Sequence, residues 1–308
     1  MDDGRKGPAR MTRINGSTRL AGVIGWPVEH SLSPVMHNAV YEVLGLNWAY
    51  LPLPVDDEMS LRRVVAAIRA LPFVGFNVTM PHKATVLELC DEVAMAAQMA
   101  GAVNTVHCVD GRLIGYNTDG RGMLESLSSD GNFDPAGKNV VLVGAGGAAG
   151  SALVAFILGR AASVTVVNRD QERAEEMIAR VQPHLNATRA SAMEIDAAET
   201  DIAAADLIVN ATSLGMRCGD PSPVPVEWLR PGQVVFDMVY GRDEPTELIA
   251  GATAAGATTL DGLGMLVNQG ATAVDIWNGG GQDRTPRDVM REAAMAELAS
   301  RVRPVEAP

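Results

Sequence analysis

The chain has 308 residues, of which 47% are hydrophobic and 20% charged, and this balance is typical of a globular protein with more than one domain. Its 37 acidic residues outnumber the 25 basic ones and give a net charge of −12, which disfavours nucleic acid and anionic lipid as partners. No apolar run approaches the roughly 18 residues that a membrane span needs, so we expect no membrane-spanning segment.

The N-terminal part of the chain predicts an α/β domain. Residues 1–18 are polar and basic, and we expect them to form a disordered leader. Beyond them, short apolar runs alternate with helical periods, which predicts a mostly parallel sheet wrapped by helices. The expected strands are 20–25, 48–55, 75–80, 102–108 and 112–116, and the expected helices are 34–44, 59–71, 83–88, 92–99 and 120–128. Ser33 is expected to cap the first helix, with Pro34 at its first position.

A strand, a tight glycine turn, a helix and a second strand follow between Val140 and Arg169. Gly144, Gly146 and Ala149 occupy the three small positions of a dinucleotide fingerprint, and the backbone amides of this turn can hold a pyrophosphate at the helix N-terminus. A tight packing turn without a ligand is the alternative. The turn residues concerned are Gly144, Ala145, Gly146, Gly147 and Ala148.

The end of the second strand indicates which dinucleotide binds. An NAD site usually has an acidic residue there, but this chain has Asn168 and Arg169, with Arg173 one helical turn later. Guanidinium groups form charge-assisted hydrogen bonds with phosphate, so these residues favour NADP(H). Asp170 would repel that phosphate, and we interpret it as the N-cap of a helix over 171–181. Its alternative role as a ribose ligand leaves NAD possible.

The rest of the chain suggests how the two domains are connected. The nucleotide-binding unit continues through strands near Leu207 and Val234 and ends near Asp261, and two helices follow over 265–277 and 286–302. Because the first domain cannot easily cover its own sheet, we expect these two helices to pack against that sheet. The predicted fold is therefore α/β with two domains, a discontinuous one over residues 19–120 and 262–308 and a Rossmann domain over residues 121–261. The tail beyond Arg303 is expected to be loose.

The cysteines argue against a fold that is held together by disulfides or by a zinc ion. Cys90, Cys108 and Cys218 are odd in number and lack C-x-x-C spacing, so neither a disulfide framework nor a zinc site is predicted. We expect a cytoplasmic protein without a metal, either a monomer or a homodimer.

Polar side chains gather at predicted loops of the first domain. Ser31 and Ser33 place two hydroxyls at a helix N-terminus, which favours an anion such as a carboxylate, although capping alone explains Ser33. The remaining candidates lie in or just after segments predicted to be strands, whose carboxyl ends are where α/β sheets bind ligands, and are Thr79, His82, Lys83, Asn104 and Asp119. His82 could be a general base or ordinary loop surface, and each of these segments could also be only a turn.

Taken together and in order, these segments resemble the motifs of shikimate dehydrogenases. The matching motifs are Ser31-x-Ser33, Asn77-Val78-Thr79 through Lys83, Ala102-Val103-Asn104-Thr105, Asn117-Thr118-Asp119-Gly120, Gly144-Ala145-Gly146-Gly147-Ala148, Asn168-Arg169, Asn210-Ala211-Thr212-x-x-Gly215-Met216, Asp237-x-x-Tyr240 and Gly262-x-Gly264-Met265-x-x-x-Gln269. The resemblance covers about residues 20–278. No single motif is decisive, but nine in order are highly specific.

The resemblance implies NADP-dependent, reversible reduction of 3-dehydroshikimate to shikimate, a step of aromatic amino-acid biosynthesis, in a cleft between the two domains. It implies that Lys83 and Asp119 flank the reacting carbon as the catalytic pair. The implied substrate-binding residues are Ser31, Ser33, Thr79, Lys83, Asn104, Asp119, Tyr240 and Gln269. The implied cofactor-binding residues are Gly144, Ala145, Gly146, Gly147, Ala148, Asn168, Arg169, Arg173, Thr212, Met238 and Gly262.

Three other interpretations remain at this point. A quinate/shikimate dehydrogenase with relaxed substrate and NAD use is favoured by Asp170, where NADP-using members of the family often have threonine, but Arg169 and Arg173 oppose it. Aminoshikimate is another possible substrate. A non-catalytic NADP-binding sensor would keep the glycine turn but would have no use for Lys83 and Asp119.

Overall fold

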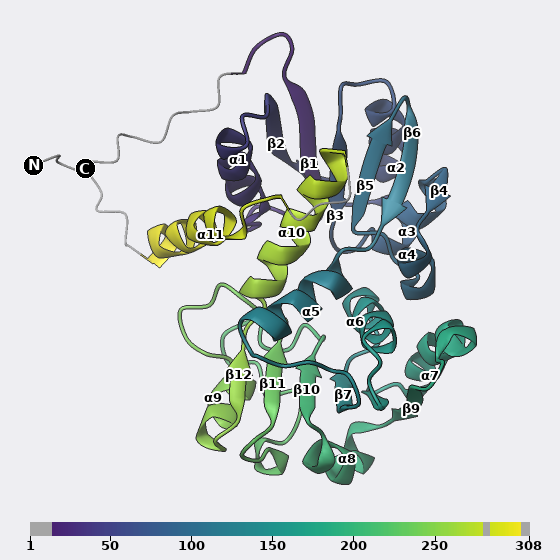
Figure 1. Cartoon of the computed structure of the whole chain (residues 1–308), viewed down its shortest axis with the longest axis vertical. Helices are drawn as coiled ribbons and strands as arrows, with labels where there is room; N and C mark the ends of the chain where they lie inside the picture. Colours follow the sequence, from purple (N-terminus) through teal and green to yellow (C-terminus); the bar gives the residue numbers. More distant parts are fainter. Residues whose placement is uncertain (1–13, 280–283, 303–308) are drawn as a thin grey trace, which may run out of the picture.

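The computed structural model describes residues 14–279 and 284–302, which form two six-stranded sheets, one above the other in Figure 1. The expectations for residues 1–13 and 303–308 lie outside the described residues. Among the described helices, none has the length and apolar character to cross a bilayer.

The upper sheet is mixed. Its strands are β1 (Arg19–Gly25), β2 (Trp48–Pro54), β3 (Gly75–Val78), β4 (Glu92–Val93), β5 (Thr105–Val109) and β6 (Arg112–Tyr116), in the order β2-β1-β3-β5-β6-β4. The pairs β1–β2, β1–β3 and β4–β6 are parallel, whereas β5 runs antiparallel to β3 and β6. Asp110 and Gly111, which connect β5 to β6, both have positive φ (48° and 77°), the geometry of a two-residue hairpin turn. This hairpin is why the sheet departs from the mostly parallel pattern predicted.

Helices α1 (Ser33–Val43), α2 (Glu58–Ile68), α3 (Lys83–Leu89) and α4 (Met95–Ala100) belong to the same part of the chain. Two predictions here were wrong. Ser33 is not the N-cap of α1, because it is already the first helical residue and Leu32 stands at the cap. The expected helix over 92–99 begins only at Met95, because residues 92 and 93 pair with Ile114 and Gly115 of β6 instead.

The expected disordered leader does not extend to residue 18. Thr18 donates through its hydroxyl to Asn47 Oδ1 at 2.8 Å, and Asn47 Nδ2 donates back to Ser17 Oγ at 3.0 Å and to Asn15 Oδ1 at 3.2 Å. These bonds tie the turn before β1 to the start of β2, so residues 15–18 are part of the fold.

The lower sheet is parallel throughout, as expected of a Rossmann unit. Its strands are β7 (Asn139–Val143), β8 (Ser163–Val167), β9 (Arg189–Met193), β10 (Leu207–Asn210), β11 (Val234–Asp237) and β12 (Thr258–Leu260), in the order β12-β11-β10-β7-β8-β9. The helices of this unit are α6 (Gly147–Leu158), α7 (Gln171–Val181), α8 (Glu199–Ala204) and α9 (Glu247–Ala254), with short 3₁₀ turns at Gln182–His184, Ile195–Ala197 and Val226–Trp228. The α/β class is confirmed, whereas β9, α8 and α9 had no clear sequence signal.

Three more helices lie beside or between the sheets. They are α5 (Asp119–Ser129), α10 (Leu263–Trp277) and α11 (Arg287–Val302). Val267, Val274 and Trp277 of α10 and Met290 of α11 share a buried cluster with Tyr50 of the upper sheet. The last two helices therefore pack beside α1 and the upper sheet, as Figure 1 shows, although they follow the lower sheet in the sequence.

Close backbone approaches join the two halves. A Cβ atom at Gly150 of α6 would lie 2.8 Å from the carbonyl oxygen of Ala100, the last residue of α4. Met123 and Leu127 of α5 belong to the same buried cluster as Phe156 of α6. The start of the Rossmann helix is thus held directly against the first sheet's helices, where the candidate site lies.

Candidate active site

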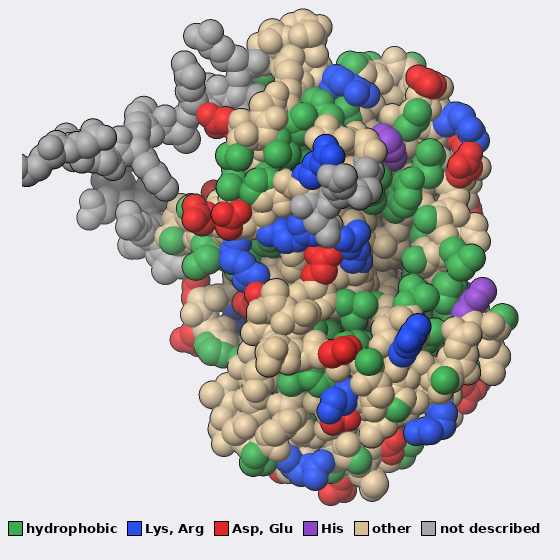
Figure 2. Space-filling model, viewed as in Figure 1, with side chains coloured by type: hydrophobic (Ala, Val, Ile, Leu, Met, Phe, Trp, Pro, Cys, Tyr) green, Lys and Arg blue, Asp and Glu red, His purple; other side chains and the backbone are tan. Residues whose placement is uncertain are grey.

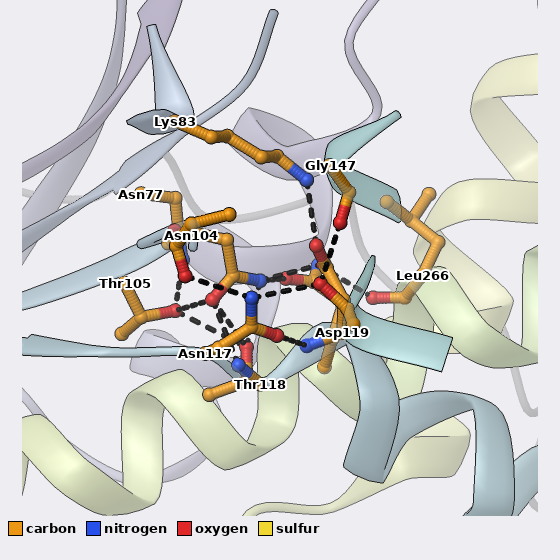
Figure 3. A network of polar contacts seen from close by, with 12 residues as sticks. Asn77, Lys83, Asn104, Thr105, Asn117, Thr118, Asp119, Gly147 and Leu266 are labelled. Atoms are coloured by element: carbon orange, nitrogen blue, oxygen red, sulfur yellow. Dashed lines mark hydrogen bonds and ion pairs between the residues drawn. The ribbon is translucent and has the colours of Figure 1, made fainter. Parts of the chain in front are cut away.

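An ion pair between Lys83 and Asp119 lies at the centre of the candidate site. Lys83 begins α3 just after β3, and Asp119 begins α5 just after β6, so both stand where a strand gives way to a helix. The Lys83 Nζ atom lies 2.6 Å from Asp119 Oδ2, as Figure 3 shows. The two side chains are only 20% and 7% exposed. The structure thus brings together the two residues predicted to be catalytic, in a partly sheltered environment.

Asn104 orients the carboxylate of this pair. Its Oδ1 atom accepts a hydrogen bond from the backbone N–H of Thr118 at 2.8 Å, so its Nδ2 atom must face the other way. There Nδ2 donates to Asp119 Oδ1 at 2.6 Å and approaches Gln269 Oε1 at 3.3 Å. One Asp119 oxygen therefore binds Asn104 while the other binds Lys83, which fixes the plane of the carboxylate.

Behind Asn104 lies a buried polar network that the sequence analysis did not assign to the site. The Tyr50 hydroxyl donates to Asn77 Oδ1 at 2.8 Å, and Asn77 Nδ2 donates to the Asn104 carbonyl at 3.2 Å and to Thr105 Oγ1 at 3.0 Å. Thr105 in turn donates to Asn104 Oδ1. The sequence signal that could have assigned Asn77 to this network is its position as a polar residue inside the apolar strand β3. Nothing in the sequence indicated that Tyr50 belongs to the network.

Asn117 connects the ion pair to the Rossmann unit. Its Oδ1 atom accepts from the backbone N–H of Asp119 at 3.2 Å, and its Nδ2 atom donates to Ser151 Oγ of α6 at 2.8 Å. Ser151 donates to the Gly147 carbonyl at 2.9 Å. A Cβ atom at Gly147 would lie 4.0 Å from Lys83 Cδ. The first turn of α6 therefore borders the catalytic candidates.

The two serines form one turn before α1. The Ser31 hydroxyl accepts a hydrogen bond from the backbone N–H of Ser33 at 3.2 Å, while α1 has no side-chain hydrogen bond from its N-cap residue, Leu32. Ser31 is half-buried and Ser33 is buried. Neither makes a hydrogen bond to Lys83 or Asp119, so the structure does not join them directly to the catalytic candidates.

Thr79 and His82 lie on the segment between β3 and α3. Thr79 is half-buried, and its methyl group packs so closely on Gly25 that a side chain at that glycine would clash. His82 is buried, with its Nε2 atom 2.7 Å from the Val55 carbonyl oxygen. His82 is therefore neither loop surface nor a free general base, and its ring instead ties α3 to the end of β2.

Gln269 and Tyr240 approach from the C-terminal part of the chain. Gln269 of α10 is buried and reaches the site through the Asn104 contact described above. Tyr240 follows β11 and packs beside the cluster formed by α1, α10 and α11. Burial raises the pKa of Tyr240, so its hydroxyl stays protonated and can donate a hydrogen bond at neutral pH. Tyr240 makes no hydrogen bond to the ion pair.

The glycine turn has the geometry needed to receive a pyrophosphate. Gly144 has φ of +115°, and a Cβ atom there would lie 3.1 Å from the Ala211 carbonyl oxygen. Gly146 is the N-cap of α6, and a Cβ atom there would meet nothing within 4 Å. Gly146 and Gly147 are exposed and Ala145 and Ala148 are half-buried. The free amides of this first turn therefore face open space, which fits a phosphate ligand.

The interpretation of Asp170 as a helix cap is confirmed. Its Oδ1 atom accepts a hydrogen bond from the backbone N–H of Arg173 at 3.4 Å, at the N-terminus of α7. Asn168 Nδ2 donates to the Asp170 carbonyl at 2.8 Å. Arg169 and Arg173 are exposed, and neither forms an ion pair within residues 14–279 and 284–302. Two guanidinium groups at the end of β8 thus remain available for an anionic ligand.

Thr212, Met238 and Gly262 meet at the ends of β10 and β11. Thr212 donates to Asn210 Oδ1 at 2.7 Å, and Asn210 Nδ2 donates to Asp237 Oδ1 at 2.9 Å. Gly262 lies so close to the Met238 backbone that any side chain there would clash. Burial raises the pKa of Asp237, although its hydrogen bonds to Thr246, Val239 and Asn210 oppose the shift. A buried carboxylate therefore joins the two loops that border this end of the sheet.

The described residues contain no cluster of His, Cys, Asp or Glu that could hold a metal ion. Cys90, Cys108 and Cys218 are all free thiols. The side chains that this site offers for chemistry are therefore a lysine, a carboxylate and amide groups beside the glycine turn.

Comparison with known proteins points to one family. The family model for the shikimate dehydrogenase substrate binding domain matches residues 23–106, and that for shikimate / quinate 5-dehydrogenase matches residues 128–216. The shikimate dehydrogenase (NADP(+)) of Geobacter metallireducens is 42% identical over 287 residues, which cover 92% of this chain and 99% of the relative.

Solved structures of similar proteins include complexes with both nicotinamide cofactors. The shikimate 5-dehydrogenase of Thermus thermophilus, in complex with NADP(H) and shikimate, is 35% identical with a TM-score of 0.78 and covers 90% of this chain and 99% of its own. The quinate dehydrogenase of Corynebacterium glutamicum, in complex with NAD, is 31% identical with a TM-score of 0.81 and covers 91% of this chain and 99% of its own.

Proposed function

The chain belongs to the shikimate dehydrogenase family, and we propose that Lys83 and Asp119 carry the proton transfer of its NADP-dependent reaction, the reversible reduction of 3-dehydroshikimate to shikimate. The observation that carries this proposal is the ion pair of Lys83 and Asp119 at 2.6 Å, beside the first turn of the dinucleotide-binding helix. The activity identifies the chain as an oxidoreductase of the shikimate pathway.

Lys83 has the donors that the reaction needs. An ammonium group carries three N–H donors, and one of them is used by Asp119 Oδ2. When bound, NADPH supplies a hydride to the carbonyl carbon of the substrate. The carbonyl oxygen then gains negative charge, and Lys83 stabilises it and donates a proton to it, a general-acid role that contributes about 10²- to 10⁴-fold in rate. In the oxidation direction the neutral amine accepts the proton again.

Asp119 would hold Lys83 in a fixed position relative to the substrate. Its Oδ2 atom holds the ammonium group, and its Oδ1 atom is fixed by the amide of Asn104. A carboxylate held on both sides cannot rotate away, so the lysine stays at a defined position. In this proposal Asp119 also accepts a hydrogen bond from a substrate hydroxyl next to the reacting carbon.

Amide and hydroxyl groups around this pair would recognise the substrate. Asn104 and Gln269, whose side chains approach each other at 3.3 Å, suit the ring hydroxyls, since an amide can both donate and accept. For the substrate carboxylate we propose neutral donors at the rim of the site. These are Ser31, Ser33, Thr79 and Tyr240.

We propose NADP(H) as the main cofactor, as in the relatives of Geobacter metallireducens and Thermus thermophilus. The pyrophosphate would lie on the turn from Gly144 to Ala148 and the adenosine 2′-phosphate between Arg169 and Arg173, next to Asn168. The exposed residues of the turn support this placement, as do the two guanidinium groups, which pair with no carboxylate among the described residues. Thr212, Met238 and Gly262 would border the nicotinamide. Asp170 caps α7 through Oδ1, which gives its carboxylate a structural role that does not depend on a ribose ligand.

The domain division stays part of the proposal, with residues 19–120 and 262–308 forming the substrate domain and residues 121–261 the Rossmann domain. The buried cluster that α10 and α11 share with the upper sheet supports it. We also propose a cytoplasmic enzyme, which three free thiols suit, acting as a monomer or homodimer.

The decisive experiment compares Lys83→Ala with the parent in NADPH-linked initial rates. We expect kcat to fall about 10²- to 10⁴-fold while the KM for shikimate changes less than about threefold, because the charge of Lys83 matters most in the transition state. Lys138→Ala is the matched control, since Lys138 also pairs with a carboxylate, that of Asp206, but at the start of β7. An unchanged kcat in Lys83→Ala would remove this residue from the mechanism.

The same assay decides between substrates. Shikimate and quinate are each tested with NADP and with NAD. A preference for shikimate with NADP supports the proposal, whereas comparable rates with quinate or NAD would identify a broader quinate/shikimate dehydrogenase. NADPH binding without turnover of any pair would point to the sensor alternative.

A further inference from the structure

The last turns of α11 touch two loops that would hold the substrate. The guanidinium of Arg301 donates through Nη1 to the carbonyl oxygen of His30 at 3.0 Å, directly before Ser31. One turn earlier in the helix, Leu298 packs on Gly241, where a Cβ atom would lie 3.0 Å from its Cδ2 atom. Gly241 directly follows Tyr240. The end of this helix therefore bridges the serine loop and the tyrosine loop.

Arg301 has N–H groups that its hydrogen bonds to His30 and Glu297 do not use. Its Nε atom pairs with Glu297 Oε1 at 3.0 Å, one helical turn away. Its Nη2 atom has no acceptor in the part of the chain that the structure describes. Arg301 also acts on Tyr240 itself, because its positive charge partly opposes the rise in pKa that burial causes there. Arg301 therefore acts electrostatically on the Tyr240 hydroxyl and forms a hydrogen bond with the backbone just before the serine turn.

The positive charge of Arg301 would help an acidic protein to attract an anionic substrate. The chain carries a net charge of −12, which repels an anionic substrate at long range. On the face shown in Figure 2, acidic and basic side chains are interspersed and form no single broad basic surface. The residues proposed for the substrate carboxylate, Ser31, Ser33, Thr79 and Tyr240, are all uncharged. Lys83, the cation beside the reacting carbon, is paired with Asp119, so a further cation close to the pocket would supply the attraction that is missing.

We propose that Arg301 is a positioning and specificity-determining residue, which holds the Ser31 turn through His30 and supplies the positive charge that makes the pocket select a carboxylate-bearing substrate. This inference rests on the proposed function. Because Arg301 acts on the far end of the substrate from the reacting carbon, its effect belongs to substrate binding and not to the chemical step.

The test uses Arg301→Met, which keeps the length and apolar stem of the side chain but removes its charge. We expect the KM for shikimate to rise about three- to tenfold, the order for one partly exposed charged contact, while kcat stays within about twofold. The methyl ester of shikimate, which lacks the negative charge but would still meet the Ser31 turn, should show a KM or inhibition constant that rises clearly less than the KM for shikimate. Arg301→Lys should recover at least half of the loss.

Arg291→Met is the control on the same helix, because Arg291 also pairs with a carboxylate, that of Asp130 at the C-terminal end of α5. Its KM values should match those of the parent. Equal rises in KM for shikimate and its ester in Arg301→Met would show a purely structural role, and unchanged values for both would show no role; either result overturns the inference.

Failure of the proposed substrate is distinguishable from failure of this inference. If the parent acts on quinate and not on shikimate, the proposed function is wrong in its substrate, but quinate also bears a carboxylate. The comparison of quinate with its methyl ester then tests Arg301 in the same way.

Discussion

Acid should destabilise this protein through one buried histidine, His37. The ring lies in α1 with no exposed surface, stacks on Tyr50 at a centroid distance of 4.1 Å, and has its Nε2 atom pressed toward Gly270 of α10. Only Nδ1 has a polar neighbour, the Tyr41 hydroxyl at 3.3 Å, whereas Nε2 has no hydrogen-bond partner among the described residues. A protonated ring would therefore bury both a charge and an unpaired N–H group.

The size of the effect follows from the pKa. Burial lowers the pKa of His37 from 6.5 to about 3, so the folded protein binds fewer protons than the unfolded chain between these two values. Stability linked to His37 is thus complete above pH 6.5 and is lost as the pH falls toward 3. Linkage gives a loss of about 2 kcal/mol at pH 5 and about 3 kcal/mol at pH 4.

The assay is urea unfolding followed by circular dichroism at several pH values between 7 and 4, for the parent and for His37→Phe. The variant cannot be protonated at this position, so its free energy of unfolding should fall by about 3 kcal/mol less than that of the parent between pH 7 and pH 4. Any constant offset from the lost Tyr41 contact cancels in this difference. His37→Gln, which keeps a polar group, should show the same reduced slope. Parallel loss of stability in parent and variants would refute the reasoning.

Three further predictions concern the Rossmann unit. Gly146→Ala should fold with a melting temperature within a few degrees of the parent but raise the KM for NADPH severalfold, because the added methyl meets no protein atom yet points into the phosphate space. Gly150→Ala should instead lower the melting temperature, since its methyl would lie 2.8 Å from the Ala100 carbonyl oxygen, and thermal unfolding of both variants checks the contrast. Arg169→Gln should raise the KM for NADP about tenfold or more and leave that for NAD nearly unchanged, because only NADP carries the 2′-phosphate. Equal effects on the two cofactors would place the 2′-phosphate elsewhere.

Much of the fold could be predicted from local patterns. The strand, glycine turn and helix that begin at β7 were identified because apolar periodicity and small residues at set spacings reflect short-range geometry. The same holds for the Asp170 cap, whose acceptor and donor are three residues apart. The carboxyl ends of strands also led to Lys83 and Asp119, because parallel strands place their ends at one edge of a sheet.

What the sequence alone could not determine depends on partners far apart in the chain. Residues 92 and 93 had the pattern of a helix but pair with β6. Strand β5 runs antiparallel to β6 through a hairpin, and the two-residue connection is the only sign of that hairpin in the sequence. Asn104 faces Asp119 because the Thr118 amide holds its other side, and it meets Gln269 across 165 positions of sequence. His82 was ambiguous until the Val55 carbonyl oxygen was found beside it. Local propensity acts over a few residues, whereas side-chain orientation and burial are set by whichever distant segments pack against them, and only the tertiary structure decides these.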